Sequence, residues 1–440
     1  QLTDSVEKIS LIVDPDGLAH GAHTCELTVT DTLNPDNRKQ VSITLLITDQ
    51  LTVPSADYPT IQAAVDAAVD GDTIMVLDGD YAGPGNTNII IDNKEITITT
   101  ANGPVHTKIF CEEPDNGFIF GWGSRNTVLS GFEINGAFFA LHLGNFTSPS
   151  IVNCTINNAD YAAACENYDS NLTMTQCNIN TTPNGIYGGI YISHGLLTLR
   201  DCIFEGGGRP IWVDYEANAI IDNCSFTGGG PIEIELNSGP DAYTVIRNCI
   251  FKQNSGDYAG ALNLKGNTRV LNCIFSENST NLYGGGAIST GYEPISIINN
   301  CTFYANNRVA GPLGLGAGAI YSRGNSEITN CIFWGNEDTS DDDIDDIYEE
   351  ADAVVTYCYI ENSNGLNPLR NNSNIFSTDS GNPVPDFVAE GTDFRLQSTS
   401  PCIDAGVSVE GLYSDQRGSI RPLDGPDSDT VAQFDIGALE

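Results

Sequence analysis

The chain has 440 residues, and its 58 Asp and Glu outnumber its 18 Lys and Arg to give a formal net charge of −40 at pH 7. A surface this acidic argues against nucleic acid as a partner and against direct insertion into an anionic membrane, and a polyanionic ligand would need bridging cations. No apolar stretch reaches membrane-spanning length, and the richness in Gly and Asn with few basic residues is typical of bacterial extracellular or cell-surface proteins.

Residues 1–50 hold three strand-like runs, ISLIVD, HTCELTVTD and KQVSITLLITD. They resemble the second half of a bacterial immunoglobulin-like module, in which a DPxGLxxGxxxxxLTVTD pattern precedes a VxITLxI strand. A complete sandwich needs about seven strands, so the resemblance implies a partial module. Either the chain is a fragment of a longer protein, or a strand from another copy completes the sandwich and drives self-assembly.

A helix is predicted near residues 59–70. Thr60 can cap its N-terminus, Gly71 can end it, and Ile61, Ala64 and Val65 begin an apolar stripe that continues at Ala68 and Val69. Such a helix would cover the open end of a solenoid. The segment IQAAVDAAVDGDTIMVLDGDY resembles the opening motif of the pectin-lyase-like superfamily of right-handed β-helices, which implies that fold and a bias toward polysaccharides.

From residue 151 to residue 360 a pattern recurs that consists of an apolar run, Asn or a substitute, Cys, any residue, then Phe or Ile. Its cysteines fall 22 to 30 residues apart, at Cys154, Cys177, Cys202, Cys224, Cys249, Cys273, Cys301, Cys331 and Cys358. A fixed period of this length, with strand-like alternation and no room for long helices, predicts a right-handed parallel β-helix of about ten coils over residues 51–365.

The position before each Cys is a predicted bend. It is occupied by Asn153, Asn223, Asn248, Asn272, Asn300 and Asn330, with Gln176, Asp201 and Tyr357 as departures. Asn tolerates a left-handed backbone, and stacked Asn side chains can share hydrogen bonds between coils. The Cys and the aromatic residue two positions later then point inward as two columns. Without paired CxxC spacing, and with an odd total of 13 Cys, we interpret the thiols as an inert buried ladder.

Each repeat also contains a strand of the form apolar–x–apolar–x, whose x residues should point outward and stack. The first outward column is predicted to contain Tyr191, Trp212, Glu233, Asn263, Ser289 and Tyr321. The second is predicted to contain Ser193, Asp214, Glu235, Lys265, Gly291 and Arg323, and His142 and Glu166 extend this face toward the N-terminus.

This face has three interpretations. It can be a structural surface that binds no ligand, since such residues suit any solvated sheet. It can bind carbohydrate, with ligand contacts from Tyr191, Trp212, Asn263, Tyr321 and Arg323. It can be catalytic, with Asp214, Glu233 and Glu235 beside Lys265, which would act as the base next to a calcium-neutralised uronate as in superfamily lyases. Neighbouring carboxylates favour the charged ammonium, which works against that base.

Calcium is a predicted cofactor at Asp214 and Glu235, in the acidic segment 337–350, or at Asp424, Asp427 and Asp429. The last three lie in a predicted C-terminal cap segment, residues 366–440, where SPCIDAG, RPLDG and FDIGALE resemble the closing segment of secreted bacterial β-helix repeat proteins. The leading prediction is a non-catalytic polysaccharide-binding or scaffolding protein. The alternatives are a calcium-assisted lyase or glycosidase and a self-assembling structural subunit.

Overall fold

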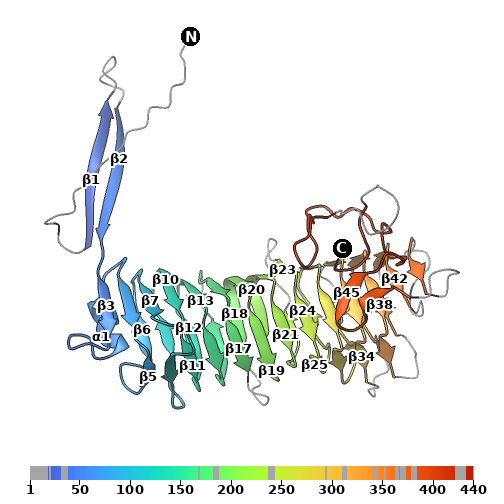
Figure 1. Cartoon of the computed structure of the whole chain (residues 1–440), viewed down its shortest axis with the longest axis horizontal. Coiled ribbons are helices and arrows are strands. Elements are labelled where there is room, and N and C mark those ends of the chain that lie inside the picture. The colour runs from blue at the N-terminus through green and yellow to red at the C-terminus, as the bar shows by residue number, and fades with distance from the viewer. Residues whose placement is uncertain are drawn as a thin grey trace, which may run out of the picture.

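The computed structural model describes residues 18, 21–30, 38–166, 169–181, 188–235, 243–292, 295–309, 315–339, 345–350, 353–361, 366, 373–377, 384–421 and 433–439. Within them, β1 (Gly21–Thr30) and β2 (Arg38–Ile47) pair antiparallel as a hairpin that stands away from the rest of the chain (Figure 1). The first run expected in this region, ISLIVD, lies outside the described residues. The hairpin leads into β3 (Gln50–Val53), where the repeating structure begins.

The predicted parallel β-helix is confirmed, with about eleven turns and one short helix. The helix α1 (Ile61–Ala67) lies at the N-terminal end of the solenoid, and Thr60 Oγ1 accepts a hydrogen bond from the Ala63 amide at 3.2 Å. It is shorter than the predicted helix because the Asp72 carboxylate accepts the Val69 amide and draws the chain into a turn. Among the described residues, no helix has the length and apolar character needed to cross a membrane.

Each coil contributes one strand to each of three parallel sheets. Sheet 1 carries the predicted outward columns and is joined to sheet 2 through the long strands β18 and β20. The strands of sheet 1 are β6 (Ile89–Ile91), β9 (Phe118–Phe120), β12 (Phe139–Leu143), β15 (Tyr161–Cys165), β18 (Ile190–Arg200), β20 (Ile211–Asp222), β22 (Ile232–Ile234), β26 (Leu262–Leu264), β31 (Ile288–Thr290), β36 (Ile320–Ser322) and β40 (Ile347–Glu349).

Sheet 2 precedes the Asn-Cys bends and sheet 3 follows them. Sheet 2 contains β3, β4 (Thr73–Val76), β7 (Thr97–Thr100), β10 (Arg125–Ser130), β13 (Ser148–Val152), β16 (Leu172–Thr175), the ends of β18 and β20, β23 (Thr244–Arg247), β27 (Thr268–Leu271), β32 (Ser296–Asn299), β37 (Ser326–Thr329) and β41 (Val354–Thr356). Sheet 3 contains β5 (Gly79–Ala82), β8 (Thr107–Phe110), β11 (Glu133–Asn135), β14 (Thr155–Asn157), β17 (Asn178–Thr181), β19 (Ile203–Gly206), β21 (Ser225–Thr227), β24 (Ile250–Lys252), β28 (Ile274–Ser276), β33 (Thr302–Tyr304), β38 (Ile332–Trp334), β42 (Tyr359–Ile360) and β43 (Ile375–Phe376).

Shorter strands complete the later coils and the C-terminal segment. They are β25 (Ser255–Gly256), β29 (Ser279–Thr280), β34 (Asn307–Arg308) and β39 (Glu337–Asp338) in one parallel sheet, β30 (Gly284–Gly285) with β35 (Gly316–Ala317), and the antiparallel pair β44 (Phe387–Ala389) and β45 (Asp393–Leu396).

The predicted left-handed bends are confirmed at all nine positions. The φ angles lie between 49° and 57°, including those of the three departures Gln176, Asp201 and Tyr357. The side chains also bond between coils, since Asn272 Nδ2 donates to Asn248 Oδ1 at 3.2 Å. The bend is therefore set by the coil geometry, and among residues with a side chain Asn adopts it at low cost.

The two inward columns are also confirmed. The rings of Phe204, Phe226, Phe251, Phe275, Phe303 and Phe333 stack at centroid distances of 4.7 to 4.9 Å. The nine repeat cysteines are buried and unbridged. Burial raises the pKa of Cys154 to about 11, so this thiol stays protonated and behaves as a small apolar group.

A second Asn ladder, which was not predicted from the sequence, lies beside sheet 3. Asn254, Asn278, Asn306 and Asn336 are almost fully buried, and each Nδ2 donates to the Oδ1 of the next at 2.9 to 3.0 Å. The signal is present in CIFKQN, CIFSEN, CTFYAN and CIFWGN, where Asn falls three residues after the Phe of the repeat.

The described part of the C-terminal segment lies along the flank of the later coils, beside β38 and β42 (Figure 1). Asn330 Nδ2 donates to the Val407 carbonyl at 2.7 Å, and the Ala438 amide donates to Thr302 Oγ1 at 3.1 Å. Phe387, Phe394 and Leu396 are buried against the outer side chains of sheet 3. This segment therefore covers the outside of sheet 3.

Candidate functional site

The structure brings the predicted first column together in continuous register across sheet 1. From β12 to β36, parallel pairing places one outward residue of each strand opposite one outward residue of the next strand. The column contains His142, Ala164, Tyr191, Trp212, Glu233, Asn263, Ser289 and Tyr321. In the second column, Lys265 Nζ lies 2.8 Å from Glu235 Oε1, so these two residues also occupy neighbouring coils.

The expectation that this face is open from residue 191 to residue 323 is wrong. Glu233 is only 8% exposed, and beyond it Asn263, Ser289 and Tyr321 are buried as well. The cause is chain that folds over the later coils: Ser289 Oγ donates to the Tyr258 carbonyl and accepts the Gly285 amide at 2.9 Å. Tyr321 is enclosed by Tyr348 and by the guanidinium of Arg323.

Arg323 packs among three tyrosines, of which Tyr321 is buried and Tyr292 is 62% exposed. Its Cζ lies 5.0 to 5.4 Å from the ring centroids of Tyr283, Tyr292 and Tyr321. Cation–π contacts of this kind hold the guanidinium in place. Tyr321 and Arg323 thus contribute to the packing of the later coils, and they do not adjoin the open part of the face.

The open part of sheet 1 carries a cluster of aromatic side chains, which we call the aromatic surface. It is made of half-buried rings from the four successive strands β12, β15, β18 and β20, namely Phe139, His142, Tyr161, Tyr191 and Trp212. Phe139 stacks on His142 with centroids 4.8 Å apart and lies 5.1 Å from Tyr161, and Tyr191 lies 4.9 Å from Trp212. Phe139 and Tyr161 were not predicted, because each lies at the start of its strand, outside the alternation.

The polar atoms of the aromatic surface are neutral around pH 7. Burial lowers the pKa of His142, and the nearby Glu166 carboxylate only partly opposes this effect. Burial, with help from the Asp214 carboxylate, raises the pKa of Tyr191 to about 12. The surface thus presents an imidazole and a phenol that exchange hydrogen bonds without carrying charge.

Charged groups adjoin the aromatic surface at its C-terminal side. Burial raises the pKa of Glu233, while Arg209, Lys265 and the hydrogen bond from Asn263 Nδ2, at 2.7 Å, act in the opposite direction. Arg209 was not predicted, because it precedes the strand in GGGRPIWVD. Its Cζ lies 4.6 Å from the centroid of the Trp212 ring.

The predicted calcium site has no direct support. Within the described ranges, no group of three or more His, Cys, Asp or Glu side chains is arranged to hold a metal ion. Asp424, Asp427 and Asp429 lie outside the described residues, as does the middle of the acidic segment 337–350. At one end of that segment, the Asp338 carboxylate forms a fully buried ion pair with Arg308 at 2.9 Å, so this carboxylate stabilises the coil. Calcium stays a prediction.

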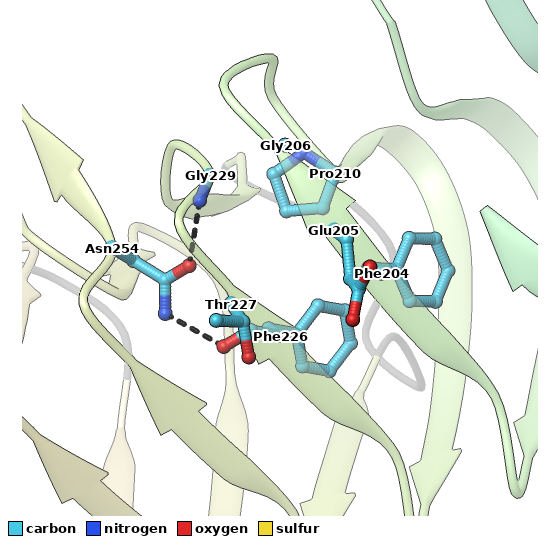
Figure 2. A pocket seen from close by; sticks show the side chains of 8 residues that line it. All are labelled: Phe204, Glu205, Gly206, Pro210, Phe226, Thr227, Gly229 and Asn254. Atoms are coloured by element: carbon cyan, nitrogen blue, oxygen red, sulfur yellow. Dashed lines mark hydrogen bonds between the residues drawn. The ribbon is translucent and has the colours of Figure 1, made fainter. Parts of the chain in front are cut away.

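Two hollows outside the aromatic surface are poorer candidates for a ligand-binding site. The one beside sheet 3 in Figure 2 is filled by its own lining, with essentially 0 Å³ left for a water molecule, and Asn254 bonds there to the Gly229 amide and the Phe226 carbonyl at 3.0 Å each. The other, of about 400 Å³, lies between α1 and β6. Its carboxylate, Asp115, already accepts hydrogen bonds from Thr87 and Asn88.

The comparisons with known proteins agree with the fold. Residues 188–342 match the family model of the right-handed β-helix region. The structure is similar to the catalytic domain of a GH87 α-1,3-glucanase in complex with nigerose, with 10% identity, a TM-score of 0.43 and coverage of 69% of this chain and 68% of that chain. No curated protein matches this sequence.

Two further solved structures are similar. Pectate lyase Pel9A is similar at 14% identity and a TM-score of 0.45, over 89% of this chain and 96% of that chain. The pectin methylesterase from Aspergillus niger is similar at 15% identity and a TM-score of 0.32, over 59% of this chain and 85% of that chain. At these TM-scores and identities the likenesses carry no argument about function, which has to be argued from the residues of this chain.

Proposed function

We propose that this protein binds polysaccharide through the aromatic surface, outside the cell or at the cell surface. The observation that carries the proposal is that half-buried rings on four successive strands of sheet 1 form two contacting groups, Phe139 with His142 and Tyr161, and Tyr191 with Trp212. Ala164 lies between the groups in the column. Strands in a sheet are about 4.8 Å apart, so the two groups offer an interrupted track of flat, amphipathic rings along the solenoid. The apolar faces of sugar rings can pack on such a track, and its edges supply hydrogen bonds.

The groups beside the track suit a ligand rich in hydroxyls. The Asp214 and Glu233 carboxylates can accept hydrogen bonds from sugar hydroxyls. Catalysis by Asp214, Glu233, Glu235 and Lys265 has less support, because Lys265 Nζ donates to Glu235 at 2.8 Å and an ammonium in that ion pair is not available to take up a proton. The contacts therefore favour binding over lyase chemistry.

Trp212→Ala tests the proposal, because this variant removes the largest ring of the aromatic surface. We expect at least a ten-fold loss of affinity for whichever soluble polysaccharide the parent protein retains in affinity gels, with little change in melting temperature. Tyr413→Ala is the control, because Tyr413 is an aromatic residue with 76% exposure on the C-terminal segment. A parent protein that retains no polysaccharide, or a Trp212→Ala variant that binds as well as the parent, would contradict the proposal.

A second candidate role, self-association, is favoured by the β1–β2 hairpin. One face of the hairpin is apolar, since Leu27 lies opposite Val41 and Cys25 opposite Ile43, and Val41 is 48% exposed. Both hairpin edges can accept another strand. Deletion of residues 1–49 should then lower the oligomer mass measured by light scattering; an unchanged mass would rule this role out.

A further inference from the structure

Arg209 lies where a ligand of the aromatic surface would have to bind. Its guanidinium carbon is 4.6 Å from the Trp212 ring centroid, and Tyr191 packs against the same residue at 4.9 Å. The Trp212 indole nitrogen is buried and has no acceptor in the described part of the chain. The largest ring of the surface is therefore covered by the protein's own side chains.

The backbone on both sides of Arg209 is fixed. The Pro210 carbonyl accepts the Ile190 amide at 2.9 Å, and the Gly208 carbonyl accepts the Gly230 amide at 2.9 Å. Exposure of the Trp212 ring therefore requires a movement of the Arg209 side chain and leaves the coil unchanged.

The Arg209 side chain is held by weak forces. In the described ranges its guanidinium makes no hydrogen bond or ion pair, so the ring contact and the attraction of Glu233 are what keep it in place. A half-exposed cation–π contact is easily exchanged for another flat partner. By contrast, Arg247 on sheet 2 is paired with the Asp222 carboxylate at 2.8 Å.

We propose that Arg209 is a latch that occupies the sugar-stacking position on Trp212, and that a ligand ring binds by displacing it. The inference rests on the proposed function, since the displacing group is a sugar ring. The latch predicts that removal of a polar residue, Arg209, from the binding surface strengthens binding. If Arg209 instead contacted the ligand directly, its removal would weaken binding.

The first test compares Arg209→Ala and Arg247→Ala with the parent by titration calorimetry, with mixed-linkage β-glucan, xyloglucan and dextran as probes. Loss of the competing contact should tighten binding of Arg209→Ala by about two- to five-fold, and Arg247→Ala should bind like the parent. Unchanged or weaker binding by Arg209→Ala would overturn the latch. Binding by Arg209→Ala to a probe that the parent does not retain would support it.

The second test needs no sugar, so it separates failure of the latch from failure of the proposed function. The chain has three Trp, and Trp122→Phe with Trp334→Phe leaves Trp212 as the only tryptophan, whose fluorescence can be excited selectively over that of the 17 Tyr. In this background Arg209→Ala should increase acrylamide quenching, because the ring loses its cover, and Arg247→Ala should not. Equal quenching with and without Arg209 shows that the ring is not covered and overturns the latch even where polysaccharide binds.

Discussion

Glu233 combines burial with charge at the edge of the aromatic surface. Because burial raises its pKa in the folded state, the folded protein keeps this proton over a pH range in which the unfolded chain has lost it. The free energy of unfolding therefore falls as the pH rises above the ordinary Glu pKa of about 4.3. At neutral pH the Glu233 carboxylate is a net cost to stability, despite the nearby Arg209 and Lys265.

Glu233→Gln should therefore increase the free energy of unfolding at pH 7, since the amide keeps an acceptor for Asn263 Nδ2 and carries no charge. The gain should disappear below about pH 4, where the carboxyl is protonated in both states. Urea unfolding at the two pH values measures the difference, and Glu216→Gln, at an exposed carboxylate, is the control. A variant less stable than the parent at pH 7 would mean that attraction to Arg209 and Lys265 outweighs the cost of burial.

The sequence predicted which residues share a column, and it failed where other chain segments intervene. Period-two alternation fixes the register of Tyr191, Trp212 and Glu233, because each strand pairs with the next coil. It carries no information on the chain that covers Ser289, since that cover depends on where the segment around Gly285 folds. Arg209 lies outside the alternation, so only its distance from Trp212 in space reveals it.

At the scale of the strands, the buried Asn ladder beside sheet 3 ties successive coils together. Asn278 Nδ2 donates to the Phe251 carbonyl and to Asn306 Oδ1, and Asn278 Oδ1 accepts from both the backbone amide and Nδ2 of Asn254. The sequence could have predicted this ladder from its spacing after the Phe of each repeat. Each buried amide left without a partner costs roughly 1–3 kcal/mol, so an interruption of the ladder should lower the free energy of unfolding.

Asn278→Ala should lower the free energy of unfolding by about 3 kcal/mol or more, because it leaves the Asn254 amide group and the Phe251 carbonyl buried without their partners. Asn157→Ala is the matched control. It also removes one member of an Asn ladder, with bonds to Asn135 at 3.1 Å and Asn180 at 2.7 Å, but on a partly exposed face where water can replace them. Chemical denaturation of both variants should show the smaller loss for Asn157→Ala; equal losses would show that burial does not set the strength of the ladder.

At the scale of the whole molecule, the outer faces of the three sheets differ in how accessible they are to a ligand. The C-terminal segment covers the outer face of sheet 3 in the later coils, and folded-over chain covers the same coils on sheet 1. The part of sheet 1 from β12 to β20 keeps its outward rings half-exposed. A long polymer can therefore approach the solenoid from the side along the aromatic surface, while the N-terminal end is occupied by α1.

The charge of the molecule favours a neutral polymer over an acidic one as the ligand of the proposed site. The chain carries a net charge of −40. Beside Tyr191 and Trp212 the carboxylates of Glu166, Asp214, Glu233 and Glu235 outnumber the cations Arg209 and Lys265. A polyuronate brings one more carboxylate with every sugar, and like charges within the Debye length of about 8 Å at physiological salt repel each other. A neutral glycan brings no such penalty.

We therefore expect affinity for a neutral glycan to change little between about 0.05 and 0.5 M NaCl, where screening is strong. Polygalacturonate should bind only when calcium is present to bridge the carboxylates, and EDTA should abolish that binding while it leaves neutral glycans bound. Affinity gels run with each polymer, with and without EDTA, measure both effects. Polygalacturonate retained equally well in EDTA would show that the acidic groups around Trp212 do not set the specificity.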